Sequence, residues 1–434
     1  MRRVATAAVS ARRYVLWFVA TLAGILALVG ATNAVLDPFG MHAWLALEGV
    51  NAAKPATHTR VRLFKAYEVE RVRPQTLVLG SSRSHVGFSC RHAALRERPG
   101  PCYNLAFDGA TTREMHAYLV HAHEVRPLKT VLLGLDSYHL SEATSATRPG
   151  FDHAVLLSPT QPAWRRAVEG DLRIAIAADT LRASVEMLRH QRDGELEWFN
   201  ADGQRLGDVF FRRDGEAFVR AGPRAYFDEI DRLEVGFQLP PPEATAARAG
   251  PAPVDPAESS LAYVGRIVAF CREHGIDLRI AITPSHVHQL EIGAMLGNEG
   301  AVERGKRALV AMLARERAGV APAQAPVPVW DFSAVSSITS EPLPPLGSRD
   351  EMQYYWDSSH FKSVVGDLVL DRVFATSSAG RRVPEDFGVR LDADSIEQVL
   401  ATQRTRHAAH RERAAADLAE LGALVDAAAR RPQP

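Results

Sequence analysis

Five short apolar runs alternate with segments of helical spacing, and this alternation constrains the fold more than any other feature. The runs are Leu77–Leu79, Cys102–Phe107, Thr130–Leu135, Asp277–Ile282 and Val327–Phe332. Strands separated by helices at such intervals are typical of βαβ units, whose strands pair in parallel. We therefore predict an α/β fold with a mainly parallel sheet. Ligands of such folds bind at the carboxyl ends of the strands, so residues that follow the runs are the first site candidates.

The overall charge argues against one class of function. The chain has 51 Lys and Arg residues and 51 Asp and Glu residues, which gives a formal net charge of zero. Such a balance provides no field that attracts nucleic acid, and we expect no nucleic-acid partner. The hydrophobic content of 46% is that of an ordinary globular protein.

The cysteines and histidines do not predict a metal site. Cys90, Cys102 and Cys271 lack the CxxC spacing of structural zinc sites. Cys90 and Cys102 are close enough in sequence to form a disulfide in an exported domain, a pairing that the sequence leaves open, whereas Cys271 fits a buried thiol. No carboxylate or cysteine completes a metal-ligand spacing with the clustered histidines, which are His116, His121, His123, His286 and His288.

The first 36 residues predict a membrane anchor. Residues 1–13 carry four arginines and no acidic residue, and Tyr14–Leu36 then runs without a charge. This run has roughly the 20 residues that span a bilayer and exceeds the roughly 7–15 apolar residues of a signal peptide. The arginines place the N-terminus in the cytoplasm, so we expect a single-pass protein of the cytoplasmic (inner) membrane with a periplasmic catalytic domain. A cleaved signal peptide, which would release a lipase-like enzyme, is the alternative.

The remaining patterns divide the chain into segments. After residue 140 the strand and helix alternation lapses, and it resumes near residue 260, so we expect an insertion that is largely helical. A basic helix over residues 61–72 precedes the first strand, with its charges expected in solvent. The predicted order is cytoplasmic N-terminus 1–13, transmembrane anchor 14–36, connecting segment 37–73, α/β domain 74–376 with insertion 141–256, and helical C-terminal tail 377–434.

A serine after the first apolar run and an Asp/His pair far downstream suggest nucleophilic catalysis. Gly80-Ser81-Ser82 follows the first run, which makes Ser82 the candidate nucleophile, with Ser84 as the alternative. A serine hydroxyl reacts at neutral pH only when an imidazole takes its proton and a carboxylate orients that imidazole. Asp357 and His360 are three residues apart, so one turn presents both side chains together.

A second Asp/His pair and a structural interpretation compete with this assignment. Asp136 and His139 have the same spacing and also follow a predicted strand. Asp357 could instead cap a helix, which would leave His360 as a surface residue. We favour Asp357 and His360 because they follow the final strand of the α/β domain and precede a clear helix.

The joint pattern resembles the SGNH (GDSL-like) hydrolase superfamily. In that family the serine follows the first strand in a Gly-Asp-Ser block, and an Asp-x-x-His block lies near the end of the domain. A glycine and an asparagine between these blocks complete an oxyanion hole. The matching positions here are Gly80-Ser81-Ser82, with serine where the family usually has aspartate, then Gly109, and finally Asp357 and His360. The resemblance implies a three-layer, flavodoxin-like α/β sandwich and a triad of Ser82, His360 and Asp357.

The third family block departs from the pattern. Gly134-Leu135-Asp136 stands where Gly-x-Asn is expected, and a carboxylate would repel a developing oxyanion. The backbone N–H groups of Ser82 and Gly109 are therefore the expected donors. Asp136, Arg83 and His286 remain as expected substrate contacts, although Arg83 could instead cap neighbouring carbonyl groups.

The anchor, the serine block and the insertion are similar to those of cell-envelope members of the superfamily. These include the D-alanine transfer proteins of teichoic acids and the accessory O-acetyltransferases of exopolysaccharides. The resemblance implies that an acyl group is transferred to, or removed from, a cell-surface polysaccharide. It also implies a polytopic membrane O-acyltransferase as a partner. We expect no cofactor. A non-catalytic accessory protein that binds glycan or scaffolds a biosynthetic complex is the alternative, and the altered third block favours it.

Overall fold

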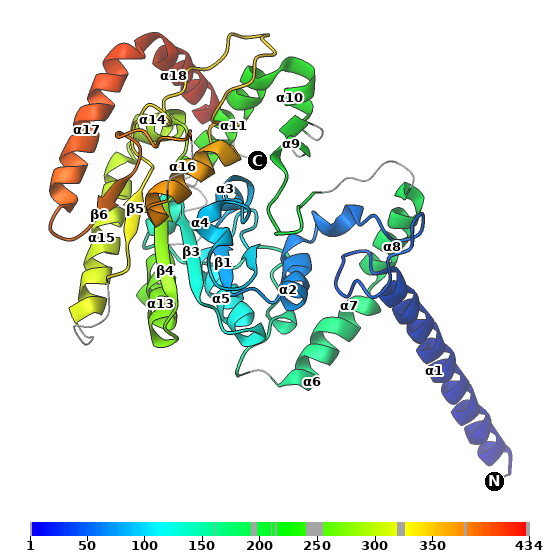
Figure 1. Cartoon of the computed structure of the whole chain (residues 1–434). Coiled ribbons are helices and arrows are strands. Elements are labelled where there is room, and N and C mark those ends of the chain that lie inside the picture. Colours follow the sequence, from blue (N-terminus) through cyan, green and yellow to red (C-terminus); the bar gives the residue numbers. More distant parts are fainter. Residues whose placement is uncertain are drawn as a thin grey trace. The chain divides into compact units, whose positions relative to one another are not determined.

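The computed structural model divides the chain into two compact units. It describes residues 2–160, 162–191, 198–209, 211–212, 215–239, 255–318, 326–376 and 380–430 (Figure 1). The helical unit comprises Met1–Arg71 and Gly150–Trp198, and the sheet unit comprises Val72–Pro149 and Phe199–Pro434. The insertion expected at 141–256 is thus shared between the units, and its segments 192–197 and 240–254 lie outside the described residues.

A six-stranded, mainly parallel sheet forms the centre of the sheet unit (Figure 1). The strands are β1 Thr76–Leu79, β2 Cys102–Asn104, β3 Thr130–Leu135, β4 Asp277–Ile282, β5 Val329–Asp331 and β6 Val389–Leu391. Their order is β2-β1-β3-β4-β5-β6, and only β6 runs antiparallel to its neighbour. The predicted α/β class with a mainly parallel sheet is therefore confirmed.

Burial explains why the central strands read as continuous apolar runs. Leu77, Val78 and Leu132 are buried, as expected where helices cover a parallel sheet. The helix α16 packs against α3, α4 and β4, and α13 packs against α5 and α15. The helical elements of this unit are α3 Ser82–Gly87, α4 Ala93–Arg96, α5 Thr112–Val125, η2 Ser137–Leu140, α9 Gly207–Val209, α10 Glu216–Ala221, α11 Pro223–Gln238, η6 Pro256–Glu258, α13 Ser260–Glu273, α14 Val287–Met295, α15 Glu299–Ala318, α16 Ser363–Phe374, α17 Ile396–Arg413 and α18 Ala415–Ala429.

The C-terminal tail contains a strand that the sequence pattern did not predict. We expected a short loop and helices over 377–434, but Val389–Leu391 pairs with β5 at the edge of the sheet. Only three residues make this strand, and Arg390 in its centre is exposed. So short a run carries no readable alternation, and pairing with β5 determines its conformation. Residues 377–379 and 431–434 lie outside the described part of the chain.

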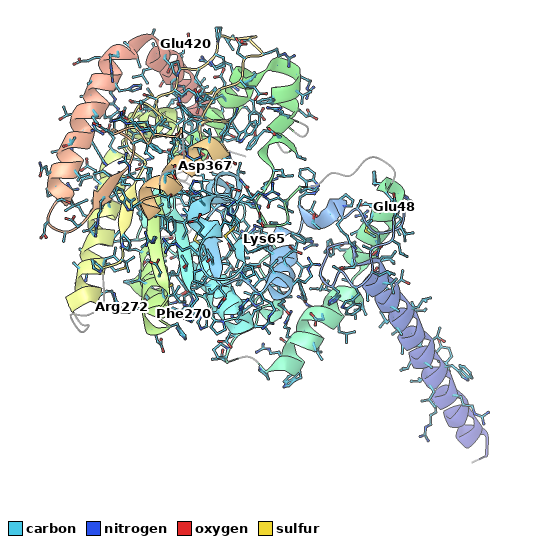
Figure 2. The ribbon with its side chains drawn as sticks, in the orientation of Figure 1. Glu48, Lys65, Phe270, Arg272, Asp367 and Glu420 are labelled. Carbon is cyan, nitrogen blue, oxygen red and sulfur yellow. A yellow bond between two sulfur atoms is a disulfide. The ribbon has the colours of Figure 1, made fainter. Side chains whose placement is uncertain are left out.

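The helical unit begins with one long apolar helix, α1 Arg2–Leu36. Its segment Ala11–Leu36 is long and apolar enough to cross a membrane, and the most apolar 18-residue window of this segment is not buried by protein. The basic helix α2 differs from expectation because Lys65 is fully buried rather than solvated (Figure 2). The other helical elements are η1 Pro55–Thr57, α2 Val61–Val72, η3 His153–Val155, α6 Ala163–Arg165, η4 Arg166–Leu172, α7 Arg173–Ala175 and α8 Ala178–His190.

One disulfide joins β2 to the segment between α3 and α4. Cys90 pairs with Cys102, and their Cα atoms are 5.6 Å apart. Cys271 is a buried free thiol on α13. Burial raises the pKa of this thiol to about 12, so it stays protonated at neutral pH.

Within the sheet unit, a buried histidine between two carboxylates joins the C-terminal helix α18 to α11 and α14. His288 Nδ1 lies 2.7 Å from Asp231 on α11, and His288 Nε2 lies 2.9 Å from Asp417 on α18. Burial alone would lower the pKa of His288, but hydrogen bonds to Asp231 and Asp417 outweigh it and raise the pKa to about 9. The histidine is therefore protonated at neutral pH and binds both carboxylates.

Raising the pH through about 9 is expected to weaken this attachment. Because the folded pKa exceeds the unfolded value of about 6.5, the stabilisation is complete below about pH 6.5 and is lost above about pH 9. At about 1.4 kcal/mol per pKa unit the loss is roughly 3 kcal/mol. Urea unfolding of the chain at pH 6 and pH 10 measures this difference in the free energy of unfolding. His288→Gln should be less stable at pH 6 and should lack this pH dependence, and an unchanged dependence would contradict the assignment.

Candidate active site

A glycine turn after β1 presents Ser82 at the carboxyl edge of the sheet. Gly80 has a φ of +153°, and a Cβ atom there would collide with the side chain of Ser84. Ser81 caps α3, since its side chain accepts a hydrogen bond from the backbone N–H of Arg83. Ser82 is thus the first residue of α3, directly beyond the strand end. This is where doubly wound sheets place ligand-binding groups.

A tight loop after β5 holds Asp357 and His360 together. Asp357 is fully buried, and its carboxylate accepts hydrogen bonds from the backbone N–H groups of Ser359 at 2.7 Å and His360 at 2.8 Å. An antiparallel bridge between Tyr355 and Phe361 closes the loop. His360 Nδ1 lies 2.9 Å from the Asp357 carboxylate. The carboxylate therefore orients both the loop and the imidazole ring.

The two distant stretches meet in space. His360 Nε2 lies 2.9 Å from Ser82 Oγ, although the residues are 278 positions apart. Because Asp357 accepts the Nδ1 proton, Nε2 is the nitrogen that can take the proton of Ser82. Burial alone would lower the pKa of His360, but the charge and hydrogen bond of Asp357 outweigh burial and raise it. Ser82, His360 and Asp357 have the geometry of a nucleophile, its base and an orienting acid.

The predicted oxyanion donors lie on adjacent loops. The backbone N–H of Phe107 donates to the carbonyl of Gly80 at 3.3 Å, which places the loop that carries Gly109 beside the serine loop. Gly109 has a φ of +59°, a conformation that favours glycine. Within the described part of the chain, the N–H groups of Ser82 and Gly109 donate to no protein acceptor. Both groups remain available to an oxyanion.

The competing Asp/His pair does not form a second catalytic dyad. His139 Nδ1 accepts from the backbone N–H of Asp136 at 2.9 Å, and its Nε2 bonds to the carbonyl of Ala110 at 2.9 Å. Both ring nitrogens are therefore used by the backbone, and the ring is buried. His139 holds the loop of Gly109 in place and has no nitrogen left for a serine.

Two of the three expected substrate contacts, Asp136 and His286, are buried and hydrogen-bonded to protein groups, and their contact with substrate stays a prediction. The Asp136 carboxylate is buried and accepts from the hydroxyls of Ser81 and Thr283, both at 2.5 Å. Burial would raise its pKa, but the charge of Arg83 and these bonds hold it below the usual range. His286 is buried, bonds the carbonyl of Glu341 at 2.8 Å and caps α14. Asp136 thus joins the ends of β1, β3 and β4, and His286 joins α14 to the loop of Glu341.

Arg83 has a mixed environment. Its guanidinium is buried, donates to Gln289 and Ser359, and lies 3.9 Å from Asp136. Burial would lower the pKa of Arg83, but the charge of Asp136 outweighs it and raises the value. The cation balances the carboxylates near the triad, so its contact with substrate stays a prediction.

Glu234 on α11 is a site residue that the sequence did not reveal. It is half-buried, and no hydrogen bond ties it to the described part of the protein. Burial raises its pKa, while the nearby charges of Arg83 and His360 lower it and that of Asp357 raises it further. Its carboxyl group therefore lies close enough to Arg83, Asp357 and His360 for their charges to act on it. No motif connects position 234 with the serine or histidine blocks, since only the fold brings α11 to the site.

External comparisons do not assign the chain to a family. No protein-family model matches it, and no curated protein matches it.

Among the described residues, no group of three His, Cys, Asp or Glu side chains could hold a metal ion. The function is therefore inferred from the chemistry of Ser82, His360 and Asp357.

Proposed function

We propose that the protein is a membrane-anchored serine acyltransferase or esterase that acts on a cell-surface polysaccharide through an acyl-Ser82 intermediate. The observation that carries this proposal is the continuous chain of contacts from Ser82 Oγ to His360 Nε2 and from His360 Nδ1 to Asp357. Ser82 follows β1, which lies between β2 and β3 where the strand order reverses. Such a switch point is the usual ligand site of open α/β sheets.

The residues divide the reaction into two transfers. Ser82 Oγ attacks the acyl carbon of the donor ester while His360 Nε2 takes the serine proton. The bond to the donor oxygen breaks, His360 protonates the leaving alcohol, and the acyl group stays on Ser82. A second hydroxyl, from water or from a sugar, then gives its proton to His360 and attacks the acyl carbon, which restores Ser82. Asp357 stabilises the imidazolium in both steps, and the N–H groups of Ser82 and Gly109 bind the oxyanion.

Several features support an SGNH-like, three-layer sandwich as the catalytic fold. The strand order β2-β1-β3-β4-β5 is that of flavodoxin-like sheets. The serine block, Gly109 and the Asp357/His360 block follow the chain order of the superfamily. The aspartate at position 136 departs from it and supplies no side-chain donor, since it accepts bonds from two hydroxyls.

The surroundings of the site support an extracytoplasmic location. An apolar helix precedes the sheet unit, and arginines precede the apolar segment, as in single-pass proteins with a cytoplasmic N-terminus. The disulfide between Cys90 and Cys102 fits an oxidising compartment such as the periplasm. We propose an inner-membrane anchor with the catalytic unit outside, beside a polytopic O-acyltransferase that delivers the acyl group.

A scaffolding protein is the second candidate, and Asp136 is the observation that favours it. Hydrolysis of p-nitrophenyl acetate by the purified chain separates the two functions, with a sugar acceptor added to detect transfer. Release of p-nitrophenol that depends on Ser82 supports the enzyme. A folded chain that releases none would support the scaffold.

The activity is expected to rise with pH, and the midpoint of this rise is expected to lie above pH 6.5. His360 must be neutral to act as a base, and Asp357 raises its pKa above the ordinary value of about 6.5. The rate should therefore fall as the pH drops through this raised pKa. Profiles of kcat/KM against pH measure the limb. Glu234→Gln is the matched control because Glu234 is a nearby carboxyl group whose pKa is also raised. A limb that vanishes in this variant would belong to Glu234 and not to His360.

A further inference from the structure

The helical unit exposes large apolar side chains outside α1. In the loop that follows α1, Trp44 is 74% exposed, and Leu45 and Leu47 are also exposed. In the helix formed by α6, η4 and α7, Trp164 is 65% exposed, and Val168 and Leu172 are exposed as well. Single exposed apolar residues are ordinary, but a group of this kind marks a contact surface. We call loop 44–50 and helix 163–175 the apolar collar.

The loop of the collar is fastened to the C-terminal end of α1. Asn51 Nδ2 donates to the carbonyl of Val35 at 3.0 Å and to that of Leu45 at 2.9 Å. Lys54 Nζ donates to the carbonyl of Leu36 at 2.9 Å. These bonds satisfy carbonyl groups that the helix end leaves open and fix the loop there (Figure 2, in which Glu48 marks this loop). Trp44 thus lies directly beyond the apolar segment of α1.

The helix of the collar is fastened to the same end of α1. Asn33 Nδ2 donates to the carbonyl of Ala175 at 2.7 Å, and its Oδ1 accepts from Ser184 at 2.9 Å. A Cβ atom on Gly30 would touch the side chain of Ile176 at 3.4 Å. Both parts of the collar therefore meet the last two turns of α1, where a membrane-spanning helix leaves the bilayer.

Some polar groups of the helix of the collar contact the rest of the helical unit, whereas Arg165, Glu169 and Arg173 are exposed. Gly170 is buried, Arg166 pairs with Glu70, and Asp171 accepts from Tyr67, all within the helical unit. Trp164, Val168 and Leu172 recur every four residues and share the exposed face. A helix packed on a soluble domain usually turns its large apolar residues inward, and these three side chains depart from that arrangement. The outward apolar face therefore suits a non-aqueous contact.

We propose that the apolar collar lies in the lipid interface of the bilayer, on the side of the membrane that the rest of the chain occupies. This proposal rests on the membrane anchoring of α1 in the proposed function. The occupant is the boundary between lipid headgroups and acyl chains, into which interfacial helices bury tryptophan and aliphatic side chains. Tryptophan is enriched at this depth because its ring is apolar and its N–H is polar. Beside the apolar face, Arg165 pairs with Glu169 and Arg173 pairs with Asp152, so the charges that border this face are balanced within the helical unit.

Quenching of tryptophan fluorescence by brominated lipid tests the proposal on the full chain. Trp17 in α1 is replaced by phenylalanine, and the protein is reconstituted in phosphatidylcholine vesicles brominated at acyl carbons 6 and 7. Trp198 and Trp356 are buried, so Trp44 and Trp164 should dominate the quenching. We expect strong quenching that falls at least twofold when Trp44→Phe and Trp164→Phe are added. The matched control, Trp330→Phe in the same background, should leave the quenching unchanged.

The alternative outcomes are distinct. Vesicle-bound chain whose Trp44 and Trp164 are quenched by acrylamide but not by bromolipid would overturn the collar and leave the anchor intact. Protection from both quenchers would mean that protein, not lipid, covers this surface, and would also overturn the collar. Chain that does not float with vesicles would overturn the anchor of the proposed function and the collar with it.

Discussion

Replacing Ser82 by alanine is expected to abolish ester hydrolysis by the purified chain. The variant keeps the turn at Gly80 and the cap of Ser81 on α3 but removes the only hydroxyl that contacts His360 Nε2 among the described residues. Loss of a catalytic serine in serine hydrolases lowers kcat by about 10⁴-fold or more. Release of p-nitrophenol from p-nitrophenyl acetate measures the loss. Ser395→Ala, which removes a hydroxyl that donates to Asp392, is the control and should keep full activity.

The result also decides between the two serines of the block. Ser84 Oγ is buried and has no hydrogen-bond partner in the described structure, because its side chain packs against Gly80 and Gly134. It is thus out of contact with His360. Activity that survives in Ser82→Ala but is lost in Ser84→Ala would contradict the proposed nucleophile.

Replacing Asp357 by asparagine is expected to lower kcat/KM by about 10⁴-fold, as in serine proteases. An asparagine oxygen can still accept the N–H groups of Ser359 and His360, so the loop is expected to keep its shape. The amide cannot stabilise an imidazolium, however, and it allows the wrong tautomer of His360. Because Asp357 raises the pKa of His360, the remaining activity should show its acid limb at a lower pH than the original protein.

A folding control separates this effect from damage to the loop. The unfolding temperature of Asp357→Asn should lie close to that of the original chain, since the backbone contacts of the loop are kept. A variant that is stable and retains activity within about tenfold would contradict the orienting role of Asp357. The same measurements of activity and unfolding temperature on Asp136→Asn test the competing pair Asp136 and His139. The ring nitrogens of His139 bond to backbone groups.

Most of the sheet could be predicted because its strands are buried on both faces. Such strands read as apolar runs bounded by breaks, and the expected bounds of β3 and β4 are those observed. The strand β6 has no such signal, since three residues with Arg390 exposed fit many conformations. The division of residues 141–256 between two units also depends on long-range packing that no local pattern reveals.

The candidate triad could be located because each of its blocks has a local spacing. The Gly-Ser-Ser turn and the Asp-x-x-His turn are short, and a parallel sheet brings the ends of its strands to one edge. Spacing alone could not separate Asp357 from Asp136, because both follow strands, and the sequence favoured Asp357 only by its place after the final strand of the α/β domain and before a clear helix. Glu234 on α11 and Gln289 on α14, which accepts from Arg83, could not be found at all, since their proximity to the site arises from the packing of these helices.

The reactivity of Ser82 toward a fluorophosphonate tests the central claim most directly. A fluorophosphonate phosphonylates a serine, with loss of fluoride, only when a base activates the hydroxyl, and mass spectrometry of the digested protein identifies the modified residue. We expect one adduct, on Ser82, in the original chain and none in His360→Ala under the same conditions. A folded chain without an adduct, or an adduct that forms equally fast in His360→Ala, would contradict the catalytic triad and favour a scaffolding role.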